Sequence, residues 1–137
     1  MNMFYIIREH EFKSQEEICE ENLIYLENEY NEIENEEKII INTHLGLNKE
    51  ERQTQISEIL NFAKLQNNDV VICGDFNEEN INLGSYKDVA QCLYEDFNPT
   101  FKKSRIDYAF VSKMIKINSY KVDQVFYSDH FPIIVEV

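Results

Sequence analysis

Two unbroken apolar runs, each followed directly by polar residues, constrain what this chain can fold into. The first run covers residues 39–41 and leads into residues 42–45, and the second covers residues 70–73 and leads into residues 74–77. Continuous β-branched runs are typical of strands that are buried on both faces, as in the parallel sheets of α/β proteins. The intervening segment is long enough for the helix that a parallel connection requires.

Residues 48–63 predict that helix. Asn48 is a favourable N-cap, and Glu51 stands three residues later, as in a capping box. The buried face is marked by apolar side chains that recur at helical spacing, namely Ile56, Ile59, Leu60 and Ala63.

Shorter patterns predict the other elements. A second helix is expected over residues 85–97, because Val89, Leu93 and Phe97 recur at intervals of four. The order strand, helix, strand, helix and then several strands predicts an α/β fold with a mixed sheet. The remaining strands are expected at residues 4–7, 23–26, 105–112, 115–125 and 131–137.

Negative charge is concentrated in the N-terminal part of the chain. The 137 residues carry a net charge of −13, and residues 9–38 contain 12 Glu but only two Lys. An acidic surface is repelled by nucleic-acid phosphates unless a basic patch or a bound cation intervenes. We therefore divide the chain into an acidic N-terminal segment with short strands, residues 1–38, and a body, residues 39–137.

Cysteine usage and hydropathy predict a cytoplasmic protein. Cys19, Cys73 and Cys92 are odd in number and widely spaced, which disfavours a disulfide framework or a zinc knuckle. The apolar residues 3–7 are too short for a signal peptide. Because no apolar stretch approaches the roughly 20 residues that span a bilayer, we expect no membrane span.

Polar residues with catalytic chemistry stand at the ends of four expected strands, in residues 42–45, 74–77, 105–108 and 128–132. Active sites of α/β folds lie at such strand ends. Each segment taken singly also fits a turn, a loop or a structural histidine. Together they predict a hydrolytic site, in which a carboxylate takes a proton from water and imidazoles donate to phosphoryl oxygens.

The ordered set of motifs resembles the endonuclease/exonuclease/phosphatase superfamily of DNase-like, metal-dependent phosphoesterases. The resemblance covers residues 39–137 and includes Arg52 and Gln55 on the first helix, which we interpret as structural or rim residues. It implies an α/β fold that is part of a four-layer α/β/β/α sandwich, with the N-terminal half of that fold missing from this chain. Glu9 is the only positional mimic of the metal-binding glutamate that the family carries in that half, and it stands far closer to His44 in the sequence than that glutamate would.

The resemblance also implies roles for the strand-end residues. Asp75 would activate or orient the attacking water, and Asn77 would contact the phosphate. His130 would donate to a phosphoryl oxygen with Asp107 behind it as its orienting partner. Two further residues complete the implied site: His44 as a second imidazole that contacts the phosphate, and Asp129 as a ligand of Mg²⁺ or Mn²⁺.

The implied function is hydrolysis of a phosphodiester or phosphomonoester, on a nucleic acid or a small phosphorylated molecule. Two alternatives are a non-catalytic remnant or binding module, and one piece of a split enzyme. An exposed sheet face would favour a complementing chain or self-association. Lys102, Lys103 and Arg105 form a basic cluster that either contacts substrate phosphates or is a solvated loop.

Overall fold

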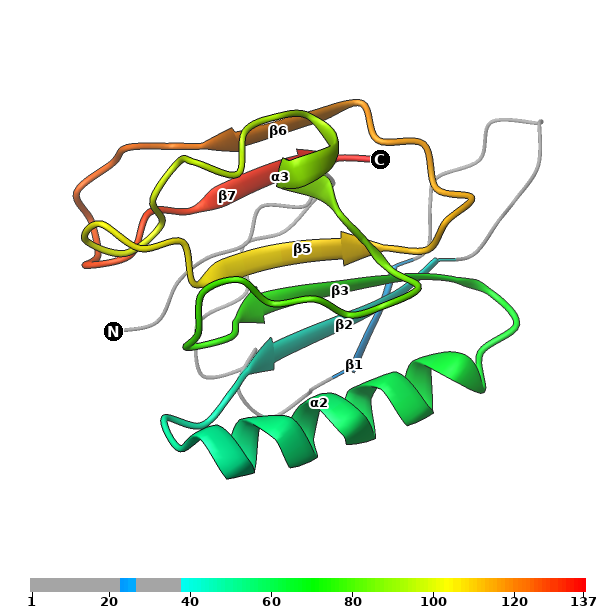
Figure 1. Ribbon diagram of the computed structural model, residues 1–137. Coiled ribbons are helices and arrows are strands. Elements are labelled where there is room, and N and C mark those ends of the chain that lie inside the picture. The colour runs from blue at the N-terminus through cyan, green and yellow to red at the C-terminus, as the bar shows by residue number, and fades with distance from the viewer. Residues whose placement is uncertain (1–22, 27–37) are drawn as a thin grey trace.

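The computed structural model describes residues 23–26 and 38–137, which form two β-sheets and two helices (Figure 1). The strand expected at residues 4–7, and Glu9, lie outside the described residues. The larger sheet has the strand order β1-β2-β3-β5-β4, and β6 and β7 form a second sheet. The elements are β1 (Leu23–Leu26), β2 (Lys38–His44), α2 (Lys49–Lys64), β3 (Asp69–Asp75), β4 (Lys87–Asp88), α3 (Val89–Cys92), β5 (Asp107–Val111), β6 (Ser119–Val122) and β7 (Ile133–Glu136).

The larger sheet is mixed, as predicted. Its two central apolar runs form β2 and β3, which pair in parallel, whereas β1–β2, β3–β5 and β4–β5 are antiparallel pairs. The register sets His44 opposite Asp75 and Asp75 opposite Asp107. Three polar residues from three neighbouring strands therefore meet at one end of the inner strands of the sheet.

Helix α2 is the predicted crossover between β2 and β3. The Asn48 side chain caps it by accepting hydrogen bonds from the backbone N–H groups of Glu50 (2.8 Å) and Glu51 (3.2 Å). The predicted face packs on one side of the sheet, where Ala63 is buried and Ile56, Ile59 and Leu60 are partly buried.

The opposite face of the sheet is covered by α3 and by the β6–β7 sheet (Figure 1). Ile40, Val71 and Ala109 from the larger sheet lie in one buried cluster with Tyr120 of β6 and Ile133 of β7. The described part of the chain is thus layered as helix, sheet and second sheet. Residues 128–132 lie in the connection between β6 and β7, and this connection returns to the strand ends that bear His44, Asp75 and Asp107.

Two sequence predictions in this region are wrong. Helix α3 spans only four residues rather than 85–97, because the backbone turns into the left-handed region at Tyr94 (φ 59°), and Phe97 is left 74 % exposed. Residues 115–125 form a strand only over β6. The basic cluster also loses a member, because Arg105 is buried against Asp88, with Nη1–Oδ1 and Nη2–Oδ2 distances of 3.1 and 2.7 Å.

Gly74, one residue before Asp75, generates the first prediction. Its φ of +142° is one that residues with a Cβ rarely adopt, and a Cβ there would overlap the carbonyl oxygen of Thr43 on β2. We expect Gly74→Ala to lower the free energy of unfolding by about 3 kcal/mol, as measured by urea titration.

Gly84→Ala is the matched control, because Gly84 also has a positive φ (66°) but open space where a Cβ would stand. It should cost only about 1 kcal/mol from backbone strain. Equal losses in the two variants would show that β2 and β3 do not approach as closely as described.

Candidate functional site

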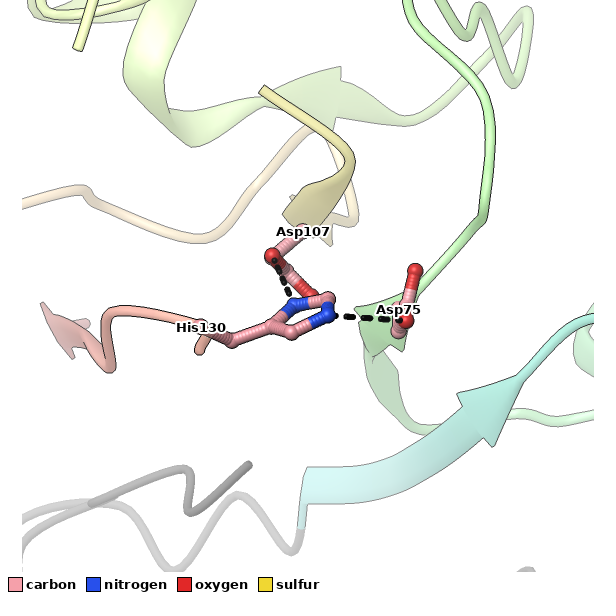
Figure 2. Close-up of side chains that lie close together, drawn as sticks. All are labelled: Asp75, Asp107 and His130. Carbon is pink, nitrogen blue, oxygen red and sulfur yellow. Dashed lines mark hydrogen bonds and ion pairs between the residues drawn. The ribbon is translucent and has the colours of Figure 1, made fainter. Parts of the chain in front are cut away.

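Four of the predicted site residues meet at the edge where β2, β3 and β5 end or begin. Asp75 Oδ2 lies 3.5 Å from His44 Nε2 and 3.9 Å from His130 Nε2, and Asp107 Oδ2 lies 3.0 Å from His130 Nδ1. Figure 2 shows the His130 imidazole between the carboxylates of Asp75 and Asp107. Its Nδ1 is hydrogen-bonded to Asp107, whereas 3.9 Å is too long for a hydrogen bond from Nε2. Nε2 is therefore available to another partner, as a donor or an acceptor according to the tautomer.

Asp107 is a fully buried carboxylate at the first position of β5. Burial raises its pKa to about 6, and the negative charge of Asp75 adds to the rise, while the neighbouring Thr100 hydroxyl and His130 oppose it. Its Oδ1 has no hydrogen-bond partner among the described residues. A buried carboxylate oxygen without a donor is costly unless a cation or another polar group faces it.

Thr100 supports this carboxylate and was missed by the sequence analysis. It is completely buried, and its hydroxyl oxygen accepts hydrogen bonds from the backbone N–H groups of Ile106 (3.2 Å) and Asp107 (3.1 Å). Its carbonyl oxygen accepts a 2.7 Å bond from the N–H of Phe131. Thr100 thus ties the start of β5 to the segment that carries His130, a connection between distant parts of the chain that no local pattern reveals.

Asn77 lies beside Asp75 and shapes the turn after β3. Its backbone N–H donates to Asp75 Oδ1 (2.7 Å), and its side-chain amide donates to the carbonyl oxygen of Leu45 (2.6 Å). The amide nitrogen therefore joins the loops after β2 and β3. The amide oxygen is the part of this side chain that remains for a phosphate contact.

Arg52 holds the loop that follows His44. Although we placed it outside the buried face of the helix, its side chain is buried, and Nη1 donates to the carbonyl oxygens of Gly46 (3.2 Å) and Leu47 (2.7 Å). Its Nε lies 2.9 Å from Glu78 Oε2 in the loop after β3. The Gln55 side chain accepts a hydrogen bond from Gly46 N–H. Both residues are structural supports of the site rather than groups facing it.

Asp75, Asp107 and His130 form a cluster that could hold a metal ion, since each offers a ligand atom within 4.8 Å of the others. Asp129 does not join this cluster. Its side chain is exposed and accepts a hydrogen bond from the Ser128 hydroxyl (3.2 Å), and its own backbone N–H is the main cause of its lowered pKa. In this arrangement Asp129 faces solvent next to the site.

The chain is similar to a known protein family. The model of a family described as the endonuclease/exonuclease/phosphatase family matches residues 28–130. A search among curated proteins found no relative with a significant match. No helix in the described ranges is long and apolar enough to cross a membrane.

Solved structures share the fold over about half of their own length. A mannosyl-6-phosphatase, Bt3783, from Bacteroides thetaiotaomicron is 24 % identical with a TM-score of 0.57, and the match covers 73 % of this chain and 51 % of that one. An endonuclease/exonuclease/phosphatase family protein from the same organism is 25 % identical with a TM-score of 0.60, covering 71 % and 48 %. Humanized Danio rerio TDP2 is 18 % identical with a TM-score of 0.57, covering 70 % and 53 %.

The raised pKa of Asp107 predicts a pH effect on stability. Between about pH 4 and about pH 6 the folded chain holds a proton on Asp107 that the unfolded chain has lost, so this contribution to stability is lost as the pH rises. Asp107→Asn removes the ionisation. We expect its free energy of unfolding, relative to the unaltered chain, to rise by about 2 kcal/mol over this range, measured by urea titration without added metal.

Asp129→Asn is the control, because the pKa of Asp129 is shifted in the opposite direction. The free energy of unfolding of Asp129→Asn, relative to that of the unaltered chain, should not rise with pH. A pH-independent difference for Asp107→Asn would mean that Asp107 titrates normally and is not buried as described.

Proposed function

We propose, because this chain belongs to the endonuclease/exonuclease/phosphatase family, that it hydrolyses a phosphoester with the help of a divalent cation. The observation that carries the proposal is the convergence of Asp75, Asp107 and His130 from β3, β5 and the segment before β7. Carboxylates and an imidazole at one strand edge supply both cation ligands and proton-transfer groups.

The residues present fit a divalent cation. Two carboxylates lie close enough for the charge of Asp75 to raise the pKa of Asp107, and Asp107 Oδ1 has no hydrogen-bond donor in the described part of the chain. Carboxylate oxygens are preferred ligands of Mg²⁺ and Mn²⁺. When bound, such a cation neutralises phosphoryl charge and lowers the pKa of water. We propose the exposed Asp129 as an additional ligand.

In the proposed reaction, Asp75 orients the attacking water and accepts its proton. The carboxylate is suited to this because its Oδ1 is fixed by the N–H of Asn77, while its Oδ2 faces His44 and His130. Asp107 accepts a hydrogen bond from Nδ1–H of His130, so that Nε2 points away from it. In its protonated form that nitrogen donates to a phosphoryl oxygen.

His44 is the second proposed phosphate contact. Its side chain is 60 % exposed and lies 3.5 Å from Asp75 Oδ2, so it can meet a substrate that approaches from solvent. We propose a phosphodiester or a phosphomonoester as the substrate, carried by a nucleic acid or a small molecule. The name of one similar structure, a mannosyl-6-phosphatase, supports the phosphoester class.

A second candidate is one piece of a two-part enzyme, completed by another chain or by self-association. The specific observation is that the chain spans about half the length of the solved structures it matches. A two-part enzyme would be inactive alone and gain activity when the complementing piece is added. The same site residues would then act within the assembly.

Substitutions of the two central residues test the proposed activity. Asp75→Asn and His130→Ala should each lower kcat/KM about 10²–10⁴-fold in a Mn²⁺- or Mg²⁺-supplemented assay with chromogenic phosphomonoesters and phosphodiesters. Asp69→Asn is the matched control, because it makes the same change at the opposite end of β3, and it should retain full activity.

Unchanged turnover in both site variants would reject the assigned roles. Absence of turnover in the unaltered chain, with or without added metal, would instead reject independent catalysis. Activity gained on adding the complementing piece would then distinguish a two-part enzyme from a non-catalytic remnant.

A further inference from the structure

The imidazole of His130 packs against an aromatic ring that no motif in the sequence indicated. We propose that Phe101 is a positioning residue that sets the orientation of His130 in the phosphoester hydrolysis proposed above, on which this inference rests. Phe101 belongs to the turn that precedes β5, far from His130 in the sequence. It is distinct from the groups expected to contact the substrate.

The two rings make a direct face contact. The centroids of the Phe101 and His130 rings lie 4.5 Å apart with an interplanar angle of 33°. The backbones of the same two residues form an antiparallel β-bridge, and the neighbouring Phe131 N–H donates to the carbonyl oxygen of Thr100 at 2.7 Å. Ring and backbone are therefore held by the same pairing of segments.

Phe101 is itself firmly placed. Its backbone N–H donates to the carbonyl oxygen of Ser104 (3.0 Å), and Ser104 N–H donates back to the carbonyl oxygen of Phe101 (2.8 Å). The ammonium group of Lys102 lies 4.6 Å from the centre of the Phe101 ring, a favourable cation–π contact. The tight turn holds the backbone that carries the ring, and the cation lies against the ring that packs on the imidazole.

This contact supplies an orientation that Asp107 alone does not. An imidazole held by its Cβ–Cγ bond and by one hydrogen bond, here Nδ1 to Asp107 Oδ2, can still tilt through small changes of its side-chain torsions. A ring packed against its face limits this tilt and keeps Nε2 directed toward Asp75. The His130 side chain is only 14 % exposed, so little solvent competes with this packing. Misplacement of a reacting group by about 1 Å can cost 10²-fold in rate.

The test compares Phe101→Leu with Phe101→Tyr in the full chain. Loss of the ring in Phe101→Leu should lower kcat about 10- to 100-fold with KM changed less than about threefold, because orientation rather than substrate contact is lost. Phe101→Tyr keeps the ring and should retain kcat within about threefold. Phe126→Leu is the matched control, since the Phe126 ring contacts Phe131 rather than the imidazole and is 86 % exposed.

A spectroscopic measurement tests the contact without any activity. The NMR signals of the His130 ring protons should shift in Phe101→Leu, through loss of the ring current, and stay in place in Phe126→Leu. Thermal melts show whether each variant is folded. If Phe101→Leu is unfolded, an unchanged kcat and unchanged His130 ring-proton signals in Phe101→Tyr still support the proposal.

Three results would overturn the inference: unshifted His130 signals in folded Phe101→Leu, a change in KM alone, or a loss of kcat in Phe101→Tyr as large as that in Phe101→Leu. If the unaltered chain has no turnover, the proposal that it hydrolyses a phosphoester on its own is rejected, but the inference about Phe101 is not. The ring-proton shifts then still decide whether Phe101 orients His130.

Discussion

The pairing of β3 with β2 on one side and β5 on the other is the constraint on which the site depends. It sets His44, Asp75 and Asp107 in adjacent register positions across three strands. A slip of one residue in either pair would turn one of these side chains to the opposite face of the sheet. The apolar residues of β2 and β3, which are buried on both faces, oppose such a slip, because it would expose part of the core.

Placing ionisable groups in this core has an energetic cost that specific partners reduce. Asp107 is compensated by His130, and the buried Asp88 by a two-point contact with Arg105, whose guanidinium also lies 4.3 Å from the Tyr108 ring centre. Removing one partner of such a pair leaves a buried charge, which is more destabilising than removing both. The Arg105–Asp88 pair anchors the start of α3 next to β5, so a residue that the sequence grouped with surface lysines has a structural role.

The sequence predicted the parts of the fold that follow local rules. The buried strands β2 and β3, the Asn48 cap and the apolar face of α2 depend on periodicity and capping, which are visible in short windows. The prediction of a helix over residues 85–97 is wrong, because three apolar residues at helical spacing cannot reveal the left-handed turn at Tyr94. Six site residues were predicted from motifs, and four of them meet at the strand ends. Thr100, Phe101 and the inward-facing Arg52 act through contacts between distant segments that spacing does not encode.

The central claim is that Asp75, Asp107, His130 and His44 form one site, in which the two carboxylates would hold a divalent cation and the two imidazoles would contact the phosphate. The most direct test is a titration of the isotopically labelled chain with Mn²⁺, whose unpaired electrons broaden the NMR signals of nearby nuclei. The account predicts that the signals of His130, Asp75 and the first residues of β5 broaden first, and that Asp75→Asn weakens this effect. Broadening confined to exposed acidic side chains, with these signals left sharp, would contradict it.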